Sequence, residues 1–234
     1  MKYSRGLAAL ILTLFFQTQL FAEYLYKDEV IFNPKFNEEI ESLGSELYKK
    51  TGISLRLVML KELPNGLNVV DYEKELLKEF NEPTILLTFS EMDSRVDIAV
   101  NDMSLYNYFN KKQVLSPSAS LVQAYFMAIF YTKSWDDFNE MRSDYGGSIL
   151  PLLASKAKKG ELLGKYSGSM FNGYLDIAEQ VAVSKGTRLD SFSSKNSDYV
   201  ILAVKFFFYS FIVYGVFMYI KRKIYMRRKR KENE

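Results

Sequence analysis

Three aspartates lie around one short turn of the sequence, and their side chains have the chemistry of cation ligands. Asp93 belongs to the turn segment SEMDS, Asp97 to the strand-like segment RVDIAV, and Asp102 follows that segment. Ca²⁺ and Mg²⁺ are bound in proteins mainly through oxygen ligands, so the three are candidate ligands for one of these cations. The alternative is a solvated strand face, because Asp97 points away from Val96 and Ile98 in an extended strand.

Two residue types are absent from the whole chain, and their absence excludes much of enzyme chemistry. The sequence contains no His and no Cys. Ser-His-Asp and Cys-His catalysis are therefore excluded, together with zinc bound through His or Cys and with disulfides. Chemistry based on carboxylate, Lys, Tyr or Arg groups remains open, as do hard cations held by oxygen ligands.

A run of aromatic residues, LYNYFNKK, is a candidate contact surface for a partner protein. Tyr106, Tyr108 and Phe109 stand within four positions of one another, and aromatic side chains are enriched at the centres of protein interfaces. The alternative is packing of these rings against the helical second half of the chain. A second aromatic run, AYFMAIFY at 124–131, is expected to belong to the core.

The C-terminal segment has the length and the flanks of a membrane anchor. Residues 199–220 form a run of 22 mainly apolar residues with one charge, Lys205. As a helix such a run is about 33 Å long, enough to cross a hydrocarbon core about 30 Å thick. Residues 221–234 hold eight Lys or Arg and two Glu, and short basic flanks stay in the cytoplasm. The sequence therefore predicts a single-pass protein of the inner or cytoplasmic membrane with a cytoplasmic C-terminus.

The basic tail has a second interpretation besides topology, which is contact with anionic lipid headgroups. Nucleic acid is not an expected partner, because a run of charge without a folded reader gives only nonspecific affinity. The residues predicted to contact lipid are Lys221, Arg222, Lys223, Arg227 and Arg228.

The N-terminus agrees with this topology. Lys2 and Arg5 precede an apolar run at 7–16, and Ala22 stands at a plausible cleavage site, so residues 1–22 are interpreted as a secretory signal peptide. Residues 23–186 then form one domain in the periplasm or extracytoplasmic space, and residues 187–198 form a polar tether. The stretch 23–198 holds 20 basic and 26 acidic residues, a net charge of −6, which also argues against nucleic acid as a partner.

The spacing of apolar residues predicts an α/β domain with a mixed, mostly four-stranded sheet packed with helices. Strands are expected at 30–32, at 53–60, at 84–89 and at 95–100. A helix capped by Asn33 and closed by Gly52 lies between the first two. A helix at 69–80, with Tyr72, Leu76 and Phe80 on its apolar face, lies between the next two. The strand-helix-strand order favours parallel neighbours, and the last strand is expected to pair antiparallel at an edge.

The second half of the chain is expected to be helical. Ser116 and Pro117 are predicted to open the helix that contains AYFMAIFY, with its apolar stripe facing inward, and Ser134 is predicted to cap the next helix. A short helix near Pro151 and a last helix that ends near Gly186 complete the domain, and the last helix is expected to face inward with Tyr174, Ile177, Ala178 and Val181.

Three stretches resemble the TPM domain, an exported domain of thylakoid-lumen photosystem repair proteins, of a nematode receptor modulator and of many bacterial membrane proteins. FNPKFNEEIESLGSELYKKTGISLRLVML is similar to the opening helix and following strand of that family. TILLTFSEMDSRVDIAV is similar to its hairpin, with Asp93, Arg95 and Val96 at the acidic-basic turn. ILPLLASKAKKGELLGKYSGSMFNGYLDIAEQVA is similar to its final helices. The resemblance covers residues 26–186 and implies a bacterial single-pass membrane protein with an exported TPM domain.

Together with the anchor and the missing His and Cys, the resemblance favours a noncatalytic interaction module. Such a module would assist the assembly, stability or turnover of a membrane protein complex from outside the cytoplasm. Some members of the family are described as acid phosphatases, so the alternative is a metal-dependent acid-phosphatase-like hydrolase that uses the hairpin carboxylates. In that case Arg56 and Arg95 are the expected phosphate-binding groups, because the transition state develops negative charge on the phosphoryl oxygens.

Overall fold

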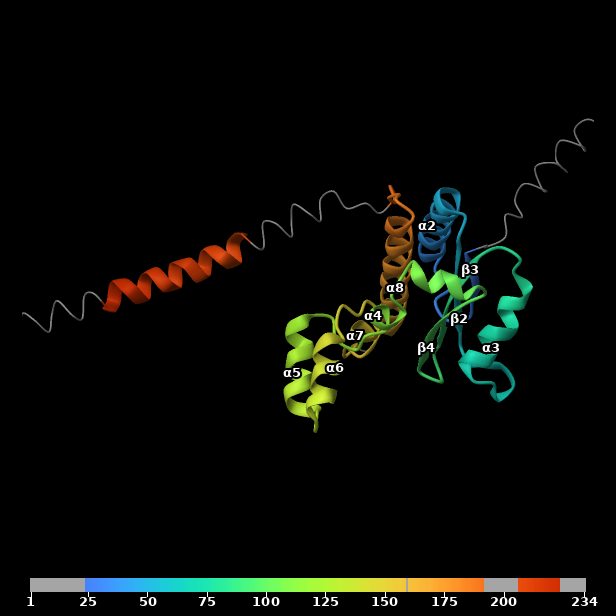
Figure 1. The fold of residues 1–234 in the computed structure, drawn as a ribbon. Helices are drawn as coiled ribbons and strands as arrows, with labels where there is room; N and C mark the ends of the chain where they lie inside the picture. Colours follow the sequence, from blue (N-terminus) through green and yellow to red (C-terminus); the bar gives the residue numbers. More distant parts are fainter. Residues whose placement is uncertain (1–23, 159, 192–205, 224–234) are drawn as a thin grey trace, which may run out of the picture. The chain divides into compact units, whose positions relative to one another are not determined.

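The structure, a computed structural model, describes residues 24–158, 160–191 and 206–223 and divides into two units, residues 1–191 and 192–234. The first unit holds the sheet and helices α2 to α8 (Figure 1), and the described part of the second is a helix over residues 206–223. Of the helices in these ranges, none combines the length and apolar character that a membrane crossing requires. The predicted signal peptide, residues 199–205 of the predicted span and residues 224–234 lie outside the described residues.

A four-stranded mixed sheet forms the centre of the first unit, as predicted. Its strands are β1 (Leu25–Asp28), β2 (Ser54–Leu60), β3 (Thr84–Ser90) and β4 (Arg95–Val100), in the spatial order β1-β2-β3-β4. β1, β2 and β3 run parallel, and β4 pairs antiparallel with β3 at the edge. The predicted directions of pairing are therefore confirmed.

The position predicted for the first strand was wrong. The strand lies at Leu25–Asp28, and the expected residues 30–32 form a turn. The carboxylate of Asp28 accepts the backbone N–H groups of Val30, Ile31 and Phe32 at 3.0, 2.8 and 2.7 Å. These bonds satisfy the backbone locally and replace the ladder of a strand, so the apolar run ends the strand instead of forming it.

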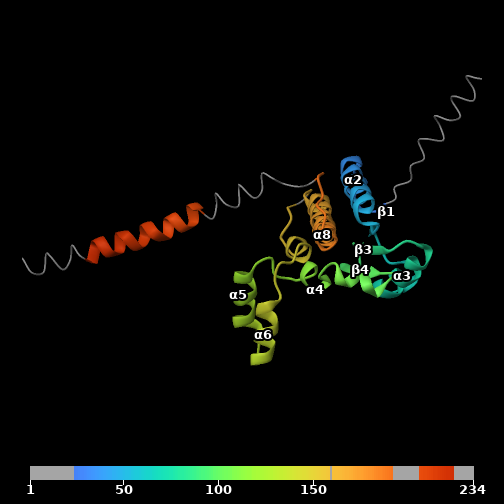
Figure 2. The same cartoon turned by 45° about the horizontal axis from the view of Figure 1, so that its top comes forward.

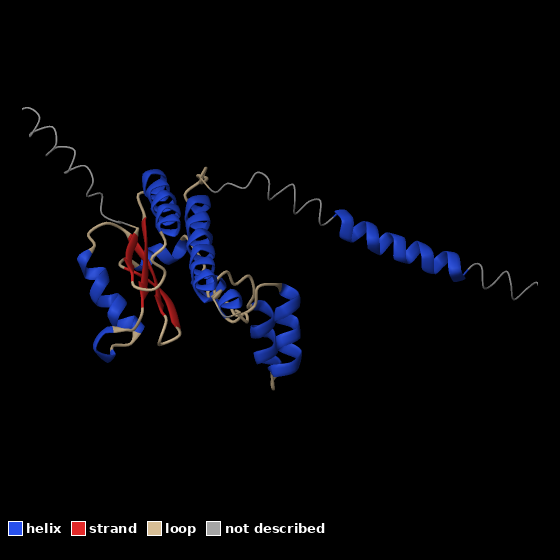
Figure 3. Ribbon diagram, turned by 180° about the vertical axis from the view of Figure 1, so that it is seen from behind, coloured by secondary structure: helices blue, strands red, loops and turns tan. Residues whose placement is uncertain are grey.

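Helices cover both faces of the sheet (Figure 3). α2 (Pro34–Thr51) and α8 (Leu162–Ser184) lie against one face, and α3 (Val69–Leu76), continued by the 3-10 turn η2 (Leu77–Glu79), lies against the other. Both layers are needed because every residue of β2 and β3 is buried. The core on the α3 side consists of Val58, Leu60, Leu63, Leu76, Leu77 and Leu86.

Both ends of α2 follow the sequence prediction. The Asn33 side chain accepts the N–H of Lys35 at 3.0 Å, and Pro34 occupies the first helical position. Gly52 closes the helix in the left-handed conformation with φ 71°, and its N–H donates to the carbonyl of Tyr48 at 2.8 Å.

α2 and α8 approach each other closely at Gly44. A Cβ at this position would overlap the ring of Tyr24 and the hydroxyl of Tyr174. The Tyr174 hydroxyl is fully buried and donates to the Leu55 carbonyl at 2.7 Å, which ties α8 to β2. The predicted inward face of the last helix is confirmed, because Tyr174, Ile177, Ala178 and Val181 are all buried.

The chain after β4 is helical, as predicted, although one helix begins later than expected. Ser120, not Ser116, caps α5, and Ser134 caps α6 as predicted. α5 and α6 form a helical hairpin that projects from the rest of the unit (Figures 1 and 2). Between β4 and α8 the elements are η3 (Met103–Asn107), α4 (Lys111–Val114), α5 (Leu121–Tyr131), α6 (Trp135–Ser143) and α7 (Leu150–Leu153), and a further 3-10 turn, η1 (Pro64–Gly66), lies between β2 and α3.

The residues after α8 belong to the folded body, whereas a tether was predicted to start at residue 187. Leu189 is buried, and the Glu46 carboxylate of α2 accepts the backbone N–H groups of Asp190 and Ser191. Lys50 of α2 pairs with Asp190 at 2.7 Å. This contact is called the C-terminal clasp below. It extends the body to Ser191, and residues 192–198 of the predicted tether lie outside the described residues.

The close approach at Gly44 yields a stability prediction. We expect Gly44→Ala to lower the free energy of unfolding by about 3 kcal/mol, because the added methyl group must displace two packed rings. Chemical denaturation of the detergent-solubilised chain, followed by circular dichroism, measures the change. Gly164→Ala in α8 is the matched control, because no atom outside its own helix would touch a Cβ there. Equal stabilities of the two variants would contradict the packing described.

The C-terminal clasp yields a second prediction, this one dependent on pH. Burial raises the pKa of Glu46, but hydrogen bonds from Asp190, Lys50 and Ser191 outweigh it and hold the pKa at about 2. A depressed carboxyl pKa stabilises the fold above the unfolded value of 4.5 and loses that effect as pH falls toward 2. We expect Glu46→Gln to cost about 1–2 kcal/mol at neutral pH and almost nothing near pH 2.

Limited trypsin digestion offers an independent readout of the clasp. Glu46→Gln is expected to speed cleavage after Arg188, whose carbonyl is held by Lys50 at 2.6 Å. Glu38→Gln, an exposed change on the same helix, is the control. Equal cleavage rates in the two variants would show that the clasp does not depend on Glu46.

Candidate functional site

A buried carboxyl group on α3 is the most unusual chemical feature of the described structure. Glu73 precedes Leu76 and Leu77 by three and four residues, so all three side chains lie on the face of α3 that packs against the sheet. The Glu73 side chain is completely buried, and neither carboxyl oxygen forms a hydrogen bond of ordinary geometry. An ionised carboxylate in such a position is strongly disfavoured.

The sheet presents two polar side chains to this carboxyl group. Thr88 of β3 and Asp97 of β4 are directly opposite each other in the antiparallel register, so both point to the face covered by α3. Thr88 is fully buried, and its hydroxyl also lacks a hydrogen bond of ordinary geometry. Asp97 therefore faces a helix, and the alternative of a solvated strand face is wrong for this residue.

Lys111 and Tyr106 complete the cluster from the segment that follows β4. The Lys111 ammonium pairs with the Asp97 carboxylate at 2.5 Å. The Tyr106 hydroxyl donates to the Ile98 carbonyl at 3.2 Å, which holds its ring beside β4. Five residues from α3, β3, β4, η3 and α4 thus form one site, which is called the Glu73 cluster below.

The electrostatics of the cluster favour a protonated Glu73. The pKa of this carboxyl group is raised to about 8, mainly by burial and also by the charge of Asp97, although Thr88 and Lys111 act in the opposite direction. Burial also raises the pKa of Tyr106. With Glu73 neutral, the charges of Asp97 and Lys111 balance, whereas ionised Glu73 would leave one uncompensated negative charge among buried groups. The chemistry open to this site is therefore the binding and release of a proton.

Glu73 was not among the sequence candidates. Its helix was expected to bury Tyr72, Leu76 and Phe80, whereas the structure buries Glu73, Leu76 and Leu77 and leaves Tyr72 and Phe80 half-buried. The spacing of three and four residues from Glu73 to the two leucines was the sequence signal that could have identified it.

The predicted metal ligands are not brought together. Asp93 accepts hydrogen bonds from the Ser90 hydroxyl at 2.5 Å and from the Leu63 N–H at 2.9 Å, so it ties the β3–β4 turn to the loop after β2. Asp102 caps η3 by accepting the Ser104 N–H at 2.9 Å. In the part of the chain that the structure describes, no group of three His, Cys, Asp or Glu side chains is placed to hold a metal ion.

The predicted phosphate-binding arginines lie apart and in different surroundings. Arg56 is buried, pairs with Glu82 at 2.6 Å and stacks over the Phe80 ring at 4.3 Å from its centroid. Arg95 is exposed at the start of β4. The register places Arg56 beside Leu86 and Arg95 beside Ser90, which are about 13 Å apart along an extended strand. The two guanidinium groups therefore do not converge on one phosphate.

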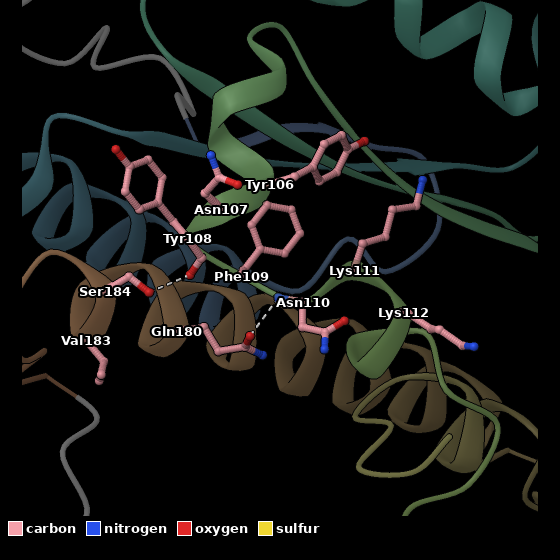
Figure 4. Close-up of a pocket in the computed structure, with 10 residues that line it drawn as sticks. All are labelled: Tyr106, Asn107, Tyr108, Phe109, Asn110, Lys111, Lys112, Gln180, Val183 and Ser184. Atoms are coloured by element: carbon pink, nitrogen blue, oxygen red, sulfur yellow. Dashed lines mark hydrogen bonds between the residues drawn. The ribbon is translucent and has the colours of Figure 1, made fainter. Parts of the chain in front are cut away.

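The predicted partner surface lies on an open groove of about 790 Å³ between the η3–α4 segment and α8 (Figure 4). Tyr106 and Tyr108 are half-buried there, whereas Phe109 is almost fully buried and packs beside Tyr106 at 5.6 Å between ring centroids. The groove is also lined by Asn107, Asn110, Lys111, Lys112, Gln180, Val183 and Ser184.

Two hydrogen bonds fix the floor of the groove to α8. The Asn110 N–H donates to the Gln180 side chain at 2.9 Å, and the Ser184 hydroxyl donates to the Tyr108 carbonyl at 2.9 Å (Figure 4). The Lys185 ammonium lies 4.1 Å from the centroid of the Tyr108 ring, a cation–π contact that steadies the ring. The groove is thus a prearranged surface with aromatic, amide and lysine groups.

The run AYFMAIFY was expected to be core, and this was wrong. The run lies in α5, where only Ala124 and Ala128 are buried. Its large side chains other than Met127 are exposed to solvent, including Phe126 and Phe130. The cause is the hairpin itself, because α6 is the one helix or strand of the described chain against which α5 packs extensively, with the Tyr125 ring against Phe138.

The predicted lipid-contacting residues are described only in part. Lys221, Arg222 and Lys223 are exposed at the end of the helix over residues 206–223, and Arg227 and Arg228 lie outside the described residues.

Comparison with known proteins adds no identification. No protein-family model matches this chain, and no curated protein matches it either. The resemblance to the TPM domain therefore stays a prediction.

The Glu73 cluster predicts an unusual dependence of stability on pH. The folded chain retains a proton on Glu73 up to about pH 8, whereas an unfolded chain releases it near pH 4.5. The free energy of unfolding therefore falls as pH rises between these values. We expect Glu73→Gln to be almost neutral at pH 4.5 and to stabilise the chain by about 3–5 kcal/mol above pH 8.

Denaturation of the two detergent-solubilised proteins across this pH range measures the difference. Glu75→Gln, an exposed change on the same helix, is the matched control and should leave the pH profile of the parent chain intact. A Glu73→Gln profile parallel to that of the parent chain would show that Glu73 binds no extra proton in the folded state.

Proposed function

We propose that this chain is a membrane-anchored interaction module that acts outside the cytoplasm and assists the assembly, stability or turnover of a membrane protein complex. The observation that carries the proposal is the groove of Figure 4, where Tyr106 and Tyr108 lie beside amide side chains on an open surface. Aromatic rings that line an open groove beside polar groups are typical of surfaces that bind a peptide segment. The groove's titratable side chains are tyrosines and lysines, which suit binding better than hydrolysis.

The sequence of the second unit supports a location at the membrane. Residues 199–220 provide an apolar run of spanning length, and the basic residues after it favour a cytoplasmic C-terminus. With the body ending at Ser191, seven residues separate it from this run, and an extended chain of that length reaches roughly 25 Å. The domain is then held at a high effective concentration near membrane partners, so weak contacts suffice.

The metal-dependent phosphatase receives no support from the described residues. Its proposed ligands Asp93 and Asp102 serve a turn and a helix cap, and Asp97 is neutralised by Lys111. We therefore do not propose Ca²⁺ or Mg²⁺ as a cofactor.

Topology can be tested with single cysteines, because the chain has none of its own. Ser191→Cys is expected to react with a membrane-impermeant maleimide in right-side-out membrane vesicles, whereas Asn233→Cys is expected to react only after the membrane is opened. The opposite pattern, or labelling of both sites in intact vesicles, would overturn the predicted orientation.

The groove can be tested with the same approach. Asn107→Cys carries a thiol-reactive crosslinker on the exposed rim of the groove, and Met92→Cys carries it on an exposed site elsewhere on the same unit. We expect Asn107→Cys alone to capture a defined membrane protein in intact membranes. Identical capture patterns at both sites would remove the groove as the binding surface.

A further inference from the structure

The helix α5 has an inverted distribution of side chains for a surface helix in water. Its two alanines, Ala124 and Ala128, are fully buried, while Phe126 is 59% exposed and Phe130 is 72% exposed. A surface helix normally buries its large apolar residues and exposes polar ones. The outer face of α5, meaning Val122, Phe126, Ile129 and Phe130, is spaced at four, three and one residues and so forms one continuous apolar stripe.

The hairpin as a whole separates apolar from charged residues. α5 contains no charged residue, and Gln123 is its only side chain with an amide. α6 carries Asp136, Asp137 and Glu140, all exposed. The two helices pack through the rings of Tyr125 and Phe138, whose centroids are 6.3 Å apart. The hairpin is therefore amphipathic, with α5 supplying the apolar side.

The turn of the hairpin has the composition of a membrane interface. Tyr131 and Trp135 flank it and are 69% and 76% exposed, and Lys133 lies between them. Tyr and Trp are enriched where a bilayer meets water, because their rings combine an apolar body with a polar atom. A lysine at such a place extends its ammonium group to the headgroups.

We propose that the outer face of α5 lies in the interfacial layer of a lipid bilayer and gives the domain a second membrane contact besides its anchor. α5 has 11 residues and a length of about 16 Å, which is too short to cross the hydrocarbon core. The helix therefore lies along the surface with its apolar stripe among the acyl chains, as interfacial helices do. The inference rests on the proposed function, because it needs the anchor to hold the domain at the membrane.

Two observations favour lipid over a second copy of the chain or another protein. With the proposed anchor inserted, the seven residues between Ser191 and the apolar run keep Ser191 within roughly 25 Å of the bilayer, so lipid is close to the domain. The absence of charge on α5 gives a protein partner no ion pair by which to set register or orientation, whereas lipid requires none.

The tryptophan of the hairpin is a built-in reporter. Trp135 is the only tryptophan in the whole chain, so excitation at wavelengths that tyrosine does not absorb observes this position alone. The full-length chain is reconstituted into phosphatidylcholine vesicles with or without bromine on the acyl chains, and vesicle flotation is measured in parallel. We expect the chain to float and brominated lipid to abolish most of the Trp135 emission.

Two double variants distinguish lipid contact through the hairpin from lipid contact through any exposed apolar residue. Phe126→Ser with Phe130→Ser removes two rings from the stripe and should restore most of the emission. Met92→Ser with Met103→Ser removes two equally exposed side chains elsewhere and should leave the quenching intact. All four side chains are exposed, so both variants are expected to fold as the parent does, which circular dichroism checks.

Flotation and quenching report on different proposals. A chain that floats but keeps its full Trp135 emission in brominated vesicles would overturn the lipid contact and leave the anchor standing. If that emission instead shifted with the protein-to-lipid ratio, a second copy would cover α5, and the lipid contact would again be wrong. A chain that does not float would overturn the anchor and the lipid contact together.

Discussion

The complete burial of the two central strands is the constraint from which the rest of the domain follows. β2 and β3 have no residue facing solvent, so each face of the sheet needs its own cover. α2 and α8 supply one layer and α3 the other. The same burial makes each polar residue in these strands depend on a nearby partner, and it explains why Thr88 and Arg56 each lie beside a charged group from another element.

The Glu73 cluster shows how such a fold accommodates a carboxyl group that propensity alone would place on the surface. A shared boundary among α3, β4 and α4 is kept electrically neutral by one proton and one ion pair between Asp97 and Lys111. Loss of that proton would leave a buried carboxylate, and water could solvate this carboxylate only if α3 moved off the sheet. The site thus links the state of one proton to the attachment of a helix. It shares Tyr106 and Lys111 with the groove, whereas the α5–α6 hairpin lies on other elements.

Sequence reasoning succeeded where local chemistry decides the outcome. The caps of α2, the apolar strand β3 and the inward face of α8 depend on neighbouring residues, and all were predicted. Sequence reasoning failed where the local structure depends on a residue far along the chain or on a side chain that competes for the backbone hydrogen bonds. Asp28 converts an apolar run into a turn, and Glu73 is buried because sheet residues far along the chain meet it. For α5, periodicity identifies an apolar helix, but it does not show what covers that helix.

The C-terminal clasp also determines how the domain responds to mechanical load. Any pull exerted through the chain from residues 192–234 enters the body at Ser191, and the first bonds on its path are those of Glu46 and Lys50 with residues 188–191. These bonds are few and lie at the surface, so they yield before α8 loses its packing against α2. Release would free the four residues 188–191 from the body, so the clasp acts as a weak link that yields before the fold and lengthens the chain that follows it.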